Sequence, residues 1–91
     1  KEVEDVIDGL DGVLESAVIG VTDADFGEAV VAVLVPEPGA TVDAAHVREQ
    51  ARRHLAAFKV PKQVHVVEAL PRNAMGKVEK AALRRTYGSV S

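Results

Sequence analysis

The stretch Ala29–Val35 is a nearly unbroken run of apolar residues, dominated by valine, that stops at Pro36. β-Branched residues favour strands, and proline ends this one because it has no N–H to donate to a sheet. A strand with one face in water alternates apolar and polar residues, so this run is expected to be covered on both faces. It therefore predicts the central strand of a sheet, with other elements packed on each side.

The segments around this run predict the rest of a small fold. Apolar residues recur with helical spacing near the N-terminus and again after Asp43, the expected N-cap of a second helix whose apolar line ends at Phe58. The expected elements are helices at 1–10, 44–58 and 78–87 and strands at 13–21, 29–35 and 63–67. This order predicts a single α+β domain with a mainly antiparallel sheet of about three strands packed with helices.

Length and composition narrow the class of protein. The 91 residues suit one small domain, and their absence of cysteine excludes disulfides and thiolate metal sites, which suits a reducing cytoplasm. No signal peptide and no apolar run of membrane-spanning length is found. Because the chain starts at Lys1, inside a helical pattern, we expect it to be part of a longer protein.

Charge is divided unevenly along the chain. Residues 1–45 hold eleven acidic residues and one basic residue, whereas residues 46–91 hold ten basic and three acidic residues. A positive C-terminal half attracts phosphates through long-range electrostatics. The alternative is that the two halves pair with each other across the fold, and the sequence leaves both interpretations open.

The segment Pro71–Lys77 carries the reactive group. Pro71 ends the strand before it, and Gly76 lets the backbone turn or approach a ligand closely just before the lysine. This pattern predicts a loop that presents a long cation, which can neutralise a carboxylate or phosphate bound elsewhere. A solvated surface lysine is the alternative.

Four motifs, in this order, resemble the C-terminal domain of the adenylate-forming superfamily, which includes acyl-CoA synthetases, nonribosomal peptide adenylation domains and luciferases. The motifs are Lys1–Glu4, Val18–Ala29 with its Phe26-Gly27-Glu28, the signature Phe58-Lys59-Val60-Pro61, and Leu70–Val78. The resemblance covers all 91 residues. Within the superfamily, Pro71–Val78 and the segment Ser16–Val21 are similar to malonyl-CoA synthetases.

The resemblance implies the lid domain of an AMP-forming acid-thiol ligase, whose N-terminal domain and hinge precede Lys1. Such enzymes convert a carboxylic acid and ATP, with Mg2+, into an acyl adenylate and pyrophosphate, and then transfer the acyl group to CoA. The lysine at the position of Lys77 is the implied catalytic residue of the first step. In some bacterial members an acetyltransferase inactivates the enzyme by acylating this lysine, which makes Lys77 a candidate for acylation.

The resemblance also implies that CoA lies against this domain during the second step. Phe26 and Phe58 are candidates to pack against its adenine, with Gly27 beside the first of them, and Lys59 and Lys62 are candidates to contact its phosphates. Gly76 is the glycine of the lysine motif. The position of Val60 is basic in some relatives, and Phe58 has a second interpretation as a core residue at the end of the apolar line.

Other classes of function find less support. A nonribosomal peptide adenylation domain and a free-standing binding module remain as alternatives to the ligase. His46, His54 and His65 are scattered without metal-ligand spacing, so no metal site is expected. A single tyrosine and the absence of interleaved aromatics argue against nucleic-acid binding.

Overall fold

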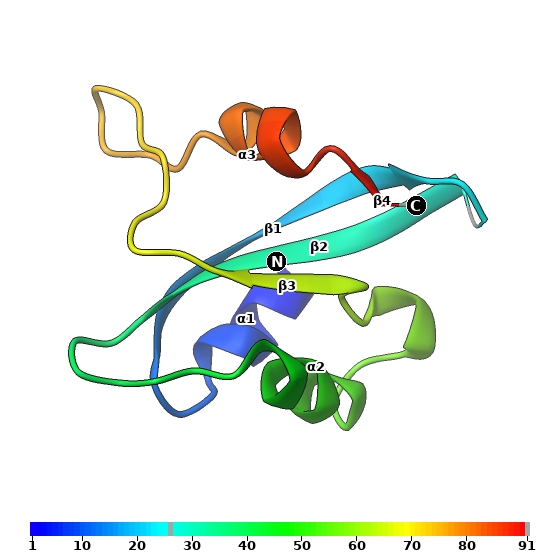
Figure 1. Ribbon diagram of the computed structural model, residues 1–91, viewed down its shortest axis with the longest axis horizontal. Helices are drawn as coiled ribbons and strands as arrows, with labels where there is room; N and C mark the ends of the chain where they lie inside the picture. Colours follow the sequence, from blue (N-terminus) through cyan, green and yellow to red (C-terminus); the bar gives the residue numbers. More distant parts are fainter. Residues whose placement is uncertain (26, 91) are drawn as a thin grey trace.

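The computed structural model describes residues 1–25 and 27–90 and shows an α+β fold, as predicted (Figure 1). In chain order the elements are α1 (Glu2–Asp8), β1 (Val13–Asp23), β2 (Gly27–Pro36), α2 (Ala44–Arg52), the 3-10 helix η1 (Ala57–Lys59), β3 (Gln63–Val66), α3 (Lys80–Tyr87) and β4 (Ser89–Val90).

The sheet has the strand order β3-β2-β1-β4. Its main unit is the long antiparallel hairpin β1–β2, to which β3 adds in parallel beside β2 and the two-residue β4 adds in parallel beside β1 (Figure 1). The expected three strands and the mainly antiparallel pairing are confirmed. The short β4 was not predicted.

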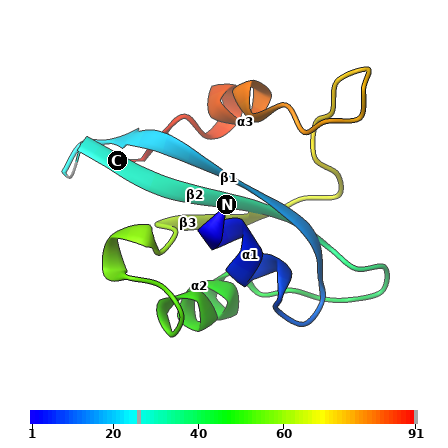
Figure 2. The ribbon, with the colours of Figure 1, turned by 180° about the vertical axis from the view of Figure 1, so that it is seen from behind.

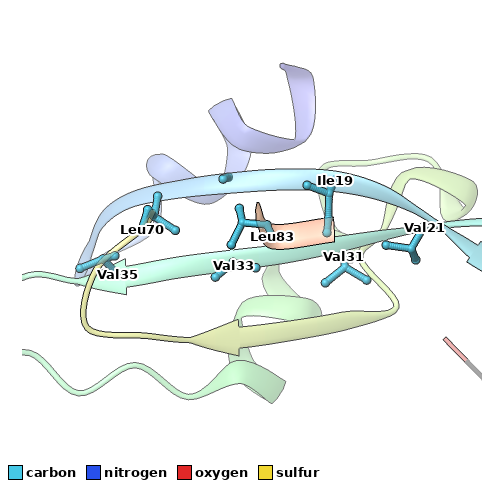
Figure 3. Close-up of a cluster of buried hydrophobic side chains, with 8 residues drawn as sticks. Ile19, Val21, Val31, Val33, Val35, Leu70 and Leu83 are labelled. Atoms are coloured by element: carbon cyan, nitrogen blue, oxygen red, sulfur yellow. The ribbon is translucent and has the colours of Figure 1, made fainter. Parts of the chain in front are cut away.

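Strand β2 is buried on both faces, as its apolar run predicts. The side chains of Val31, Val33 and Val35 join one hydrophobic cluster with Leu70 and Leu83, and Figure 3 shows these side chains gathered along β1 and β2. Its alternate residues Ala32 and Leu34 belong to a second cluster, and both are fully buried.

Helices cover the two faces of the sheet separately. In Figures 1 and 2, α3 lies on one side of the sheet, and α1 and α2 lie on the other. Leu83 of α3 packs into the first cluster, whereas Ile7 of α1 and Val47 of α2 pack into the second. The fold is therefore three layers, with the sheet in the middle.

A bulge near the start of β1 changes which way its side chains point. The register of β1 against β2 shifts between Val13 and Glu15. Val13 lies in the cluster with α1 and α2, yet Ala17 and Ile19, an even number of residues further on, lie in the cluster with α3. The extra residue, Leu14, thus inverts the alternation of the strand.

Two expected helix boundaries were wrong. α2 ends at Arg52 rather than running to Phe58, because the chain must return to the sheet, where the Lys62 N–H donates to the Val30 carbonyl at 2.8 Å to begin β3. α3 begins at Lys80 rather than at residue 78, because Val78 still pairs with Arg72 in an antiparallel bridge.

Ion pairs join the acidic first half of the chain to its basic second half. Lys59 pairs with Glu2, Lys62 with Asp23, Arg72 with Glu15, and Lys80 with Glu4. The interpretation in which the two halves neutralise each other is thus observed for these four cations. None of the helices formed by the described residues has the length and apolar character needed to cross a bilayer.

Candidate functional site

Residues 71–79, here called the lysine loop, form a tight hairpin-like turn. The Asn73 N–H donates to the Lys77 carbonyl at 2.9 Å, and the Gly76 N–H donates to the Asn73 carbonyl at 2.9 Å. Just outside this turn, Arg72 pairs with Val78. The loop therefore has a defined backbone path, although its residues 72–77 are exposed.

The Asn73 side chain organises the turn from inside. Its Oδ1 accepts hydrogen bonds from the Met75 N–H at 2.8 Å and from the Lys77 N–H at 3.1 Å. Gly76 adopts φ +85°, a conformation that side chains with a Cβ rarely take. Asparagine at the start and glycine before the lysine are thus the two residue types that this turn needs.

Lys77 projects from the loop into solvent. Among the residues that the structure describes, its ammonium group has no hydrogen-bond or ion-pair partner. Its neighbour Met75 is also 83% exposed. An unpartnered cation on a fixed backbone can bind an anion on another body without first breaking an ion pair of its own.

Two ion pairs attach the loop to the acidic half of the chain. Arg72, at its start, pairs with Glu15 of β1. Directly after the loop, Lys80, the first residue of α3, pairs with Glu4 of α1 at 2.8 Å, and the same Glu4 oxygen accepts the Val18 N–H at 2.8 Å. The loop is therefore held at both ends.

The surroundings of the Glu4 carboxylate shift its pKa. Burial raises its pKa, but the hydrogen bonds from Lys80 and from the Val18 N–H, together with the charge of Lys80, outweigh that effect. The pKa of Glu4 consequently lies below its ordinary value, and the carboxylate is ionised at neutral pH.

A groove of about 640 Å3 lies between the paired ends of β1 and β2, at Asp23 and Glu28, and the α2–η1 segment. Phe58, 79% exposed, forms part of its wall. The charged side chains that line it are Asp23, Glu28, Arg48, Arg52 and Lys62, with apolar surface from Ala29, Val30, Ala57 and Val60. The groove thus combines an exposed aromatic ring and three cations with two carboxylates.

The groove's cations differ in how they are bonded. Lys62 donates to the buried Asp23 carboxylate at 2.8 Å, and Arg52 pairs with Glu49 at 3.0 Å. Arg48 donates through Nε to the Pro61 carbonyl at 3.0 Å. Within the described part of the chain, the two terminal nitrogens of Arg48 carry no hydrogen bond, so they are left for an anion.

The structure separates the predicted CoA-contacting residues. Phe58 and Lys62 both line the groove. Lys59 does not line it: its ammonium donates to Glu2 and lies over the Phe58 ring, 5.6 Å from the ring centroid. The core interpretation of Phe58 was wrong, because the helix ends before it. Gly27 begins β2 with φ +80°, and Phe26 lies outside the described residues.

Sequence reasoning missed two groove residues. Arg48 and Arg52 of α2 were not among the predicted site residues, yet both line the groove. The available signal was their spacing of four, which places two arginines together on one helix face just before the Phe58 motif.

The groove and the lysine loop lie at opposite ends of the molecule. Figures 1 and 2 show the loop at one end of the long axis, and η1 with the end of β1 and the start of β2 toward the other. The molecule extends 36 Å along this axis. Among the described residues, no three His, Asp or Glu side chains come together in a way that would hold a metal ion.

The fold and the loop define an α+β domain that presents a lysine outward rather than into a cavity of its own. The family model of the AMP-binding enzyme C-terminal domain matches residues 2–77. This chain belongs to that family, as its motifs predicted.

Individual relatives include several CoA ligases. The 3-[(3aS,4S,7aS)-7a-methyl-1,5-dioxo-octahydro-1H-inden-4-yl]propanoyl:CoA ligase of Mycobacterium tuberculosis is 51% identical over 91% of this chain and 16% of that protein. The feruloyl-CoA synthase of an Amycolatopsis species is 41% identical over 96% of this chain and 18% of its own length.

A solved structure shows the same fold. The crystal structure of ATP-bound MatB from Rhodopseudomonas palustris matches with a TM-score of 0.91 and 55% identity, over 96% of this chain and 17% of that one. The chain therefore spans about one sixth of the length of these relatives.

Proposed function

We propose that this chain is the mobile C-terminal domain of an ATP-dependent acyl-CoA synthetase located in the cytoplasm. The carboxylate of an acid attacks the α-phosphate of ATP, the bond to the β-phosphate breaks, and pyrophosphate leaves. The thiol of CoA then attacks the carbonyl of the acyl adenylate, and AMP leaves. The observation that carries the proposal is the exposed, unpartnered ammonium of Lys77 on a turn whose backbone is fixed.

In the first step the role of Lys77 is electrostatic. The incoming carboxylate and the α-phosphate are both anions, so they repel each other as they approach. An ammonium placed between them reduces this repulsion and stabilises the charge that develops in the transition state. No general base is needed, because the acid is already ionised at neutral pH.

In the second step the groove receives the nucleotide end of CoA. Phe58 supplies a ring on which adenine stacks, and Arg48, together with the predicted Lys62, supplies cations for the phosphates. The predicted contact of Lys59 with the phosphates is less favoured, because Lys59 is not among the residues that line the groove. The position of Val60 is basic in some relatives but uncharged here. Arg48, which lines the same groove, supplies a cation in its place.

The separation of the two sites requires movement. One fixed orientation of a 36 Å body cannot bring both of its ends to a single reaction centre. The domain therefore turns between the half-reactions, presenting Lys77 first and the groove second. ATP is held mainly by the N-terminal domain, and Mg2+ is assigned to ATP and that domain, since the described residues gather no acidic cluster for it.

We propose malonate or a methylated malonate as the acid. The proposal rests on the resemblance of Pro71–Val78 and Ser16–Val21 to malonyl-CoA synthetases. The named relatives act on chemically different acids, including feruloyl and bicyclic propanoyl compounds. The identity of the acid is tested by comparing kcat/KM for a panel of acids with the full-length enzyme.

The test of the adenylation role is Lys77→Ala in the full-length protein. Pyrophosphate exchange driven by the acid should fall by about 10²- to 10³-fold, the range found when one transition-state donor is removed. Transfer from a supplied acyl adenylate to CoA should survive, because that step does not use Lys77. Arg84→Ala, which removes another exposed cation on α3, is the control. Equal loss of both half-reactions would refute the assignment.

A further inference from the structure

We infer that Arg72 is a positioning residue for Lys77, and that it depends on Glu15, which the bulge in β1 turns toward the lysine loop. This inference rests on the proposed function, in which Lys77 serves the adenylation half-reaction. Arg72 does not touch the reacting groups in this account. It acts by fixing the peptide unit from which Lys77 extends.

The guanidinium of Arg72 joins two parts of the molecule. Its Nη1 donates to the Gly76 carbonyl at 2.8 Å, and its Nη2 donates to the Glu15 carboxylate. Glu15 lies in β1, the strand that pairs with the central β2, so it provides a fixed point outside the loop. Arg72 therefore connects the residue before Lys77 directly to the sheet.

The peptide unit between Gly76 and Lys77 is held on both sides. Its carbonyl accepts from Arg72, and its N–H donates to Asn73 Oδ1 at 3.1 Å. The next carbonyl, that of Lys77, accepts the Asn73 N–H at 2.9 Å. Because the peptide planes before and after Lys77 are both bonded, the direction of its Cα–Cβ bond is set.

Without Arg72, the peptide unit between Gly76 and Lys77 would be held only through its N–H, by Asn73 Oδ1. Gly76 has φ +85° and no Cβ, so rotating the plane of the Gly76–Lys77 peptide meets little steric resistance. The bond from Arg72 to the Gly76 carbonyl opposes that rotation. A small rotation at this peptide would displace the ammonium, which lies at the end of a four-carbon side chain.

The bulge explains how Glu15 comes to face the loop. Val13 points into the cluster under α1 and α2, and in a regular strand Glu15 would point to that same face. The extra residue, Leu14, places Glu15 in phase with Ala17 and Ile19, on the face covered by α3. The distortion of β1 thus aims an acid at Arg72, a use of bulges that recurs beside active sites.

The experiment uses the full-length enzyme with Arg72→Ala, Arg72→Lys and Glu15→Gln, and Arg84→Ala as the control. Arg72→Ala should lower kcat for pyrophosphate exchange by about 10- to 100-fold, because a displacement of about 1 Å at a catalytic group is worth up to that much. The KM values for ATP and acid, and acyl transfer from supplied acyl adenylate to CoA, should stay unchanged. Glu15→Gln should give a smaller loss in the same half-reaction.

Double variants separate positioning from other roles. Arg72→Ala should add nothing to Lys77→Ala, since Arg72 acts through that lysine, and Glu15→Gln should add nothing to Arg72→Ala. Arg72→Lys should restore part of the rate, because one ammonium satisfies only one of the two partners at a time.

Three results would overturn the inference. They are equal loss of both half-reactions in Arg72→Ala, a normal adenylation rate in both Arg72→Ala and Glu15→Gln, and a further loss when Arg72→Ala is added to Lys77→Ala. If Arg72→Ala fails to fold, the adenylation rate of Glu15→Gln decides whether the inference holds. A normal adenylation rate in Lys77→Ala would instead show that the proposed function itself is wrong.

Discussion

Replacing Glu4 with glutamine should destabilise the domain in a pH-dependent way. The Glu4 side chain is 19% exposed and accepts hydrogen bonds from Lys80 of α3 and from the Val18 N–H of β1, each at 2.8 Å. Glutamine keeps the shape and can still accept the Val18 N–H, but it loses the charge. The substitution therefore isolates the ionic part of a contact that joins α1, β1 and α3.

The size of the effect follows from the exposure of the two partners. Hydrogen bonds to charged groups contribute about 1.5–3 kcal/mol when well shielded. The Lys80 side chain is 40% exposed, so solvent screens the pair, and we expect Glu4→Gln to cost about 1 kcal/mol at neutral pH.

The pH dependence has a definite sign. The pKa of Glu4 is lower in the folded protein than its ordinary value of 4.5. Its stabilising contribution is therefore fully present above that ordinary value and is lost as pH falls through the folded-state pKa. At lower pH the wild-type side chain is protonated and neutral, like glutamine, so the two proteins should converge in stability.

Urea unfolding of the 91-residue chain, followed by circular dichroism from about pH 7 to about pH 3, measures this difference. Asp5→Asn is the matched control, because it also removes an acid from the first turn of α1 but from a side chain that is 60% exposed. Its effect should be smaller and should vary less with pH. A constant difference between wild type and Glu4→Gln over the whole range would refute the reasoning.

Two further substitutions test the groove and the core. Phe58→Ala should raise the KM for CoA by about tenfold in the full-length enzyme, since base stacking is worth about 1–3 kcal/mol, yet leave the stability of the domain nearly unchanged because Phe58 is 79% exposed. A large drop in the urea midpoint with no change in KM would contradict this. Leu34→Ala should cost about 2–5 kcal/mol in urea unfolding, because Leu34 is fully buried on β2. A loss below about 1 kcal/mol would show that the second cluster repacks around the cavity.

The central strand was predictable because its cause is local. The run Ala29–Val35 has no polar position that water could reach, so any stable fold must cover both of its faces. The structure does so with α3 on one face and with α1 and α2 on the other. Strands β1 and β3 were likewise located to within a few residues.

The end of α2 was not predictable from periodicity alone. Leu55 and Phe58 continue the helical spacing, but Pro61 stops any helix and β3 must start at Gln63, beside β2. The chain therefore turns after Arg52, which buries Leu55 and leaves Phe58 in solvent. Tertiary pairing decided this boundary.

The bulge in β1 was not predictable from the sequence. Adjacent apolar residues occur at the start of the strand, at Val13 and Leu14, but also further on, from Ala17 to Ile19, so they do not locate a shift in register. The partner of Glu15 was not predictable either, because Arg72 is 57 residues away in sequence.

The lysine motif of the candidate site was predictable from the sequence, but the full groove was not. Lys77 and its glycine were found from one contiguous motif, and the structure places both on an ordered turn. The groove draws on residues from β1, β2, α2 and the segment before β3, so no short motif contains it. The family resemblance made Phe58 and Lys62 candidates, but only the fold brings Arg48 to them.

The lysine loop and the groove lie at opposite ends of the long axis in both views of the molecule. When a rigid domain of this shape turns about a point between its ends, one end approaches the reaction centre only as the other moves away. In the proposed reaction cycle, this shape alone would keep the thiol site away while the adenylate forms, and would withdraw the ammonium once CoA arrives. The order of adenylation and thiol transfer would then follow from the shape of the domain, without a separate signal.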